Sequence, residues 1–180
     1  MEDSLHIIRE RAENLGTRTD WRRPEGPQSF PPATAEQVRA VEDSLDFRLP
    51  EFLTKVYCSI GNGGFGPGSG LIGLPGGATD QHQNSILDLY DSFSASNPDD
   101  DSWQWPEKLV PICHWSGAIY SCVDCSSRDG SVVCVDLSEH GPGRDLKASM
   151  TPQCPTLESW LRSWAEGVDL WQEMFPLDLE

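Results

Sequence analysis

Five residues in the second half of the chain have side chains that could bind a metal ion. Cys122 and Cys125 form a C-x-x-C pair, and Cys113, His114 and Cys134 lie nearby in sequence. Thiolates and imidazoles are zinc ligands, so a Cys-ligated metal site is one interpretation. A second closely spaced ligand pair is missing, however, and no helix start that could activate a redox thiol is predicted here. We therefore expect these thiols to pack in the core and to bind no metal.

A glycine-rich segment, residues 61–77, holds nine of the sixteen glycines of the chain. Within it, Gly68 to Gly73 match the G-x-G-x-x-G pattern of dinucleotide-binding folds. That pattern binds pyrophosphate where it follows a strand and begins a helix. Here a predicted helix precedes the pattern, and Pro75-Gly76-Gly77 follows it. We interpret the segment as a structural join between helices and sheet, with four packing side chains: Phe65, Leu71, Ile72 and Leu74.

No set of catalytic residues is evident in the sequence. The surroundings of Ser69 and Ser116 do not match the G-x-S-x-G nucleophile motif. A single histidine is weak evidence for a general base, and the four histidines are scattered: His6, His82, His114 and His140. Calcium loops alternate their ligands, whereas residues 99–101 are three consecutive aspartates. The sequence predicts neither enzymatic activity nor a cofactor.

The charge of the chain is strongly negative, with 13 basic and 29 acidic residues and a formal net charge of -16. Such a charge repels phosphate backbones and anionic membrane surfaces, so we expect neither nucleic acid nor membrane as a partner. No Lys or Arg occurs between Lys55 and Lys108, and this stretch has the strongest negative field. The natural complement is a basic protein.

Two tryptophans, Trp103 and Trp105, follow the three aspartates of the acidic stretch. Exposed aromatic side chains surrounded by charge are typical anchors of protein-binding surfaces. Local packing of the loop is the alternative, since Pro106 could dock it. The predicted partner-binding residues are Asp91, Asp99, Asp100, Asp101, Trp103 and Trp105.

The length of 180 residues is that of one ordinary domain. We expect a cytoplasmic protein, since the first residues lack a basic and apolar signal sequence and no apolar run approaches the roughly 18 residues of a membrane span. In that compartment the six cysteines are expected to be reduced. A monomer or a weak homodimer is expected.

Hydrophobic periodicity and capping residues predict five helices and three strands. The helices are expected at residues 3–15, after Thr34, from Pro50 to a stop at Gly61, after Ser85, and from Thr156 to Gly167. Three strands in a β-meander are expected at residues 109–115, 118–123 and 131–137.

Several of these pieces, in this order, resemble the SUKH superfamily, which includes Smi/Knr-type cell-wall-assembly regulators and bacterial toxin-immunity proteins. The resemblance covers most of residues 21–171. It rests on residues 31–33, Val41-Glu42, Leu45, Trp105-Pro106, residues 109–115, residues 118–122 and the helix with Trp160, Leu161, Trp164 and Gly167. Its central motif is Leu49, Pro50, Tyr57, Gly61, Asn62, Gly63, Gly64, Phe65 and Gly66.

The resemblance implies an α+β fold, a mostly antiparallel sheet packed with helices, and no enzymatic activity. The expected organisation is an N-terminal helical extension (1–20), a SUKH-like domain (21–175) and an acidic tail (176–180). The predicted function is that of an immunity-type protein that binds and neutralises a basic toxin or related partner. The alternatives are a regulatory scaffold in cell-wall or housekeeping assembly and a Cys-ligated metalloprotein or enzyme.

Overall fold

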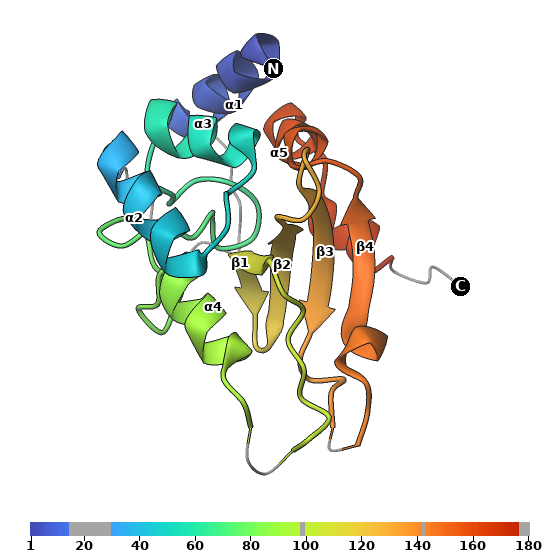
Figure 1. The fold of residues 1–180 in the computed structure, drawn as a ribbon. Coiled ribbons are helices and arrows are strands. Elements are labelled where there is room, and N and C mark those ends of the chain that lie inside the picture. The colour runs from blue at the N-terminus through green and yellow to red at the C-terminus, as the bar shows by residue number, and fades with distance from the viewer. Residues whose placement is uncertain (15–29, 98–99, 142, 177–180) are drawn as a thin grey trace.

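A four-stranded antiparallel sheet lies at the centre of the fold (Figure 1). The computed structural model describes residues 1–14, 30–97, 100–141 and 143–176. The strands follow one another in the order β1 (Leu109–Ser116), β2 (Ile119–Asp124), β3 (Ser131–Asp136) and β4 (Met150–Cys154). The predicted α+β class and the β-meander of the first three strands are confirmed.

The fourth strand was not predicted. β4 lies at the edge of the sheet, pairs only with β3 in the described part of the chain, and contains Pro152. A proline has no backbone N–H to donate, so it is tolerated in a strand at the edge of a sheet. In the sequence, however, a proline argues against a strand, and β4 was therefore not predicted. A short 3-10 helix, η2 (Leu146–Ser149), leads into β4.

The described residues form six α-helices, of which α1 to α4 lie to one side of the sheet and α5 at its upper end (Figure 1). The capping residues that predicted α2 (Ala35–Leu45) and α4 (Ile86–Ser94) both form capping boxes, from Thr34 with Gln37 and from Ser85 with Asp88. In each box the cap hydroxyl accepts a backbone N–H that the first turn leaves unpaired.

The predicted ends of α3 (Glu51–Ser59) and α5 (Leu157–Glu166) are found within a residue or two. Pro50 is the residue before α3 and not its first residue, because its ψ of 138° is extended. Gly167 ends α5 in the left-handed conformation, with φ of 94°. Beyond it, the chain forms a short helix that was not predicted, α6 (Leu170–Met174).

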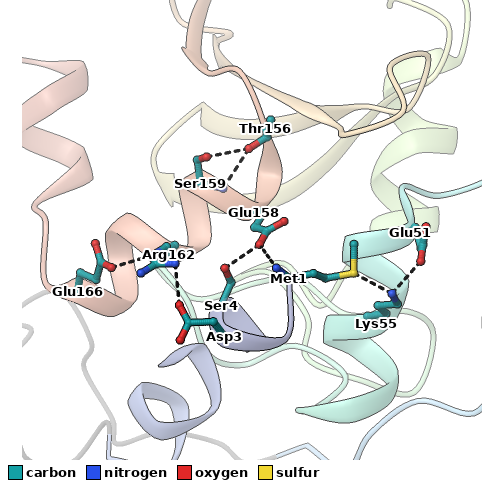
Figure 2. Close-up of polar contacts among 10 residues, drawn as sticks. All are labelled: Met1, Asp3, Ser4, Glu51, Lys55, Thr156, Glu158, Ser159, Arg162 and Glu166. Carbon is teal, nitrogen blue, oxygen red and sulfur yellow. Dashed lines mark hydrogen bonds and ion pairs between the residues drawn. The ribbon is translucent and has the colours of Figure 1, made fainter. Parts of the chain in front are cut away.

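The N-terminal helix α1 (Glu2–Glu13) packs along α5 (Figure 2). It buries Leu5 and Ile8 in the common core. The Ser4 hydroxyl donates to Glu158 at 2.7 Å, and Arg162 pairs with Asp3 at 2.9 Å. Exposed ion pairs contribute little to stability, so most of the stability of this contact comes from the two buried apolar side chains.

The glycine-rich segment joins the helices to the sheet, as predicted. It runs along the free edge of β1, where the Ile72 N–H donates to the Ile112 carbonyl at 2.8 Å and Leu71 bridges to Cys113. Its four packing side chains are all buried. No helix begins within or directly after residues 68–73, so the pattern lacks the setting that a dinucleotide requires.

Asn62 holds the two ends of this segment together from the inside. Its side chain is buried, accepts the Leu74 N–H at 2.8 Å and donates to the Leu74 carbonyl at 3.3 Å. Its backbone carbonyl accepts the Ala78 N–H at 2.9 Å. Tyr57 fastens the same segment to α3, since its hydroxyl donates to the Ile72 carbonyl at 2.5 Å.

No helix among the described residues has both the length and the apolar character that a membrane crossing requires.

Candidate partner-binding surface

The predicted partner-binding residues lie on α4 and on the loop that connects it to β1. Asp91 lies on α4 and Asp101 on the loop, and both side chains are exposed. The side chain of Asp100 is largely buried, with an exposure of 9%. Asp99 falls outside the described residues. The surface formed by Asp91, Asp100, Asp101, Trp103 and Trp105 is called the acidic loop surface below.

The two tryptophans pack within the loop while remaining partly exposed. The Trp103 Nε1–H donates to the Phe93 carbonyl at 2.8 Å, and the Trp105 Nε1–H donates to the Leu109 carbonyl at 2.7 Å. The rings of Trp103 and Trp105 stack with centroids 6.2 Å apart, and Phe93 lies 4.7 Å from Trp105. Both indoles therefore fix the loop to the end of α4 and the start of β1.

A buried polar cluster holds the other side of the loop. The carboxylate of Asp100 lies 3.0 Å from Nε2 of His140, with side-chain exposures of 9% and 8%. The Ser102 hydroxyl donates to the same carboxylate and accepts the Gly143 N–H at 3.0 Å. The Trp103 ring stands edge-on to the His140 ring at 5.3 Å. The loop after β3 is thus tied to the loop before β1.

This cluster stabilises the charged form of Asp100. The hydrogen bond from the Ser102 hydroxyl lowers the pKa of Asp100, and the Ser102 backbone N–H and His140 lower it further. These contacts favour the carboxylate form of Asp100, and its oxygens bind groups of the protein itself.

The carboxylates of Asp91, on α4, and Asp101, on the loop, are both exposed, in contrast to that of Asp100. A cationic partner would be steered by the local negative field and would meet the exposed parts of two stacked indoles.

The cysteine-rich strands do not form a metal centre in the described part of the chain. Cys122 is fully buried on β2, whereas Cys125 follows the strand and is half-buried. Burial raises the pKa of Cys122 and raises that of Cys125 to about 12. Thiols with such pKa values are protonated near neutral pH, which opposes both metal ligation and redox attack. No disulfide joins the six cysteines, all of which lie in the described part of the chain.

A single histidine is weak evidence for a general base, and His114 is a buried residue of β1. Its Nε2 lies 3.0 Å from the Gly117 carbonyl oxygen, and its ring stacks on Tyr120 at a centroid distance of 4.6 Å. Its exposure is 1%, so no substrate could reach it in this conformation.

Sequence reasoning missed the contribution of His140 to the acidic loop surface. His140 is 40 residues from Asp100, and nothing in its neighbourhood distinguishes it from the other histidines. Only the meeting of the two loops brings the pair together. The edge strand β4 was missed for the reason given above.

Taken together, the described residues form an α+β domain with exposed carboxylates and two partly exposed indoles on α4 and the loop before β1. The model of one family matches residues 32–163, from just before α2 into α5. The chain belongs to this family, the SMI1/KNR4 family (SUKH-1), and the predicted resemblance is confirmed. No curated protein sequence matches the chain.

Proposed function

We propose that this protein is an immunity-type binding protein whose acidic loop surface captures and neutralises a basic toxin or a related basic partner. The observation that carries the proposal is the ordered acidic loop surface on a domain of net charge -16. Membership of a generally non-enzymatic family that suggests protein binding supports it.

The proposed mechanism is occlusion. The exposed carboxylates accelerate the encounter with a cationic surface, and the partly exposed indoles bury apolar area once contact is made. Because the loop is held at both ends, little rearrangement is needed on binding. A regulatory scaffold would use the same surface, and the identity of the partner distinguishes the two roles.

The test uses a candidate basic partner, chosen from the proteins encoded by genes beside the gene for this chain. Association is measured by surface plasmon resonance at several salt concentrations, with the double variant Asp91→Asn/Asp101→Asn compared with the unmodified protein. Loss of two steering charges is expected to slow association by about threefold to tenfold at low salt. Toxin activity in the presence of each variant reports neutralisation.

The control removes two exposed charges from α1, in the double variant Glu2→Gln/Glu13→Gln. Both carboxylates are exposed and lie at the opposite end of the molecule from the acidic loop (Figure 1). If the two double variants slow association equally, the loop is not the binding surface. If added salt strengthens binding, electrostatic capture of a basic partner is wrong.

A further inference from the structure

A second feature lies on the sheet face that α5 and α6 cover. It is a cavity of about 140 Å³, between β3 and β4 on one side and the C-terminal helices on the other. Its lining residues are Cys134, Asp136, Ser149, Thr151, Pro152, Gln153, Trp160, Leu170, Glu173, Met174 and Phe175. It is called the β4–α6 cavity below.

The lining has an apolar wall and an opening to solvent. Trp160 and Leu170 are buried, with exposures of 1% and 7%, and Met174 adds a flexible apolar side chain. Thr151 and Glu173 are exposed, so they lie on the side that opens to solvent. The cavity is therefore a recess in the surface that an entering side chain could fill without unfolding α6.

The charge of the lining is entirely negative. Asp136 and Glu173 are its charged residues, and no Lys, Arg or His belongs to it. The Ser138 N–H and hydroxyl both donate to one oxygen of Asp136, at 2.9 and 2.6 Å, which fixes the direction of this carboxylate. Burial, followed by the nearby Asp136, raises the pKa of Cys134 to about 11, so that thiol stays neutral. The field in the cavity thus comes from two carboxylates.

The size and shape of the cavity restrict its occupant. A cavity of about 150 Å³ in another protein is known to hold benzene, so 140 Å³ admits about six or seven non-hydrogen atoms. An arginine side chain has that size. Its methylene groups can pack on an apolar wall such as that of Trp160 and Leu170, and its planar guanidinium pairs with carboxylates through several donors, whereas a lysine ammonium is a strongly hydrated point charge.

We propose that the β4–α6 cavity binds an arginine side chain of the basic partner, with Trp160 and Leu170 against its apolar part and Asp136 and Glu173 against its guanidinium. The inference rests on the proposed function for its occupant. It adds a specific anchor to the steering that the acidic loop surface supplies. The loop after Asp136 leads within four residues to His140, so cavity and acidic loop surface are joined through one short segment.

The first experiment needs no partner. N-acetyl-arginine amide is titrated into the protein while the tryptophan indole N–H signals are followed by two-dimensional NMR. The Trp160 indole is a suitable reporter because it lines the cavity and its Nε1 has no hydrogen-bond acceptor within the described chain. A saturable shift of this signal is expected, with weaker binding of N-acetyl-lysine amide and of N-acetyl-norleucine amide.

Two variants test the cavity by independent means. Asp136→Asn/Glu173→Gln removes the charges and is expected to weaken arginine amide binding by at least about tenfold, given the usual strength of hydrogen bonds to charged groups. Thr151→Phe places a large side chain at the opening on an exposed strand position, and is expected to abolish the Trp160 shift. Circular dichroism and thermal unfolding confirm that both variants fold.

Glu2→Gln/Glu13→Gln again serves as the charge-matched control and is expected to leave the titration unchanged. Equal binding of arginine and norleucine amides, equal binding to the charge variant, or shifts spread over many signals without saturation would each overturn the inference.

The fate of the proposed function is read separately, from the partner itself. If the partner binds and Asp136→Asn/Glu173→Gln leaves its dissociation rate unchanged, the arginine anchor is wrong and the proposed function stands. If the arginine amide binds in the cavity and no basic partner binds the protein, the proposed function is wrong, although the cavity does bind arginine. Faster dissociation of the partner from both cavity variants supports both the arginine anchor and the proposed function.

Discussion

Replacing Asn62 by alanine tests whether one buried amide holds the glycine-rich segment in place. The Asn62 side chain is 3% exposed and pairs with both backbone groups of Leu74. The Asn62→Ala variant leaves the Leu74 N–H without its acceptor in a buried site, which costs about 1–3 kcal/mol. The Leu74 carbonyl still accepts the Gly77 N–H at 2.8 Å, so its loss is smaller, at about 0.5–1 kcal/mol.

The sum is a loss of about 1.5–4 kcal/mol in the free energy of unfolding. For a chain of this length that corresponds to a fall in melting temperature of about 3–16 °C. Urea denaturation followed by circular dichroism and tryptophan fluorescence measures the free energy, and calorimetry measures the melting temperature.

Asn14→Ala is the matched control, because the Asn14 amide donates to the Glu10 carbonyl at 2.7 Å on the exposed end of α1. It is expected to change stability by less than about 0.5 kcal/mol. If Asn62→Ala lowers the free energy of unfolding by no more than Asn14→Ala does, the claim that the Asn62 side chain holds the glycine-rich segment in place is refuted.

The remaining predictions concern packing, a second buried hydrogen bond and pH. Gly77→Ala is expected to cost about 1–3 kcal/mol or more, because a Cβ there would lie 2.3 Å from Asn62, whereas Gly141→Ala meets nothing within 4 Å and should be near neutral in the same unfolding assay. Tyr57→Phe leaves the buried Ile72 carbonyl without the hydroxyl and should cost about 1–2 kcal/mol, while partner binding stays unchanged; equal stability would contradict the contact. Asp100→Asn should destabilise the protein near neutral pH. The pKa of Asp100 is lowered on folding, so the stability that its carboxylate contributes is complete above the ordinary aspartate pKa and is lost as the pH falls through the lowered pKa. The stabilities of Asp100→Asn and the unmodified protein should therefore converge in acid. A difference in stability that widens in acid would refute this.

Local signals in the sequence were sufficient for most helices and for the meander. The pairs Thr34 with Gln37 and Ser85 with Asp88 act within one helical turn, so their chemistry is complete in a few adjacent residues. The strands before and after Gly130 are likewise predicted by apolar runs that flank a turn.

Signals that depend on long-range contact were not available from the sequence. β4 has exposed residues and a proline, and it becomes a strand because β3 offers it a hydrogen-bonding edge. The expectation that Trp103 and Trp105 are aromatic anchors did not foresee that both indole N–H groups donate to backbone carbonyls. Those carbonyls belong to Phe93 and Leu109, whose positions relative to the loop are set by the whole domain.

The sequence by itself determined the fold class, the family resemblance, the negative charge and the structural role of the glycine-rich segment. These follow from composition, from short-range capping and from the order of motifs along one chain. The tertiary structure alone decided that His140 meets Asp100 and that Asp136 and Glu173 share one cavity. Such pairings join residues far apart in the sequence, and no local preference encodes them. They arise when the loops and helices pack on the sheet.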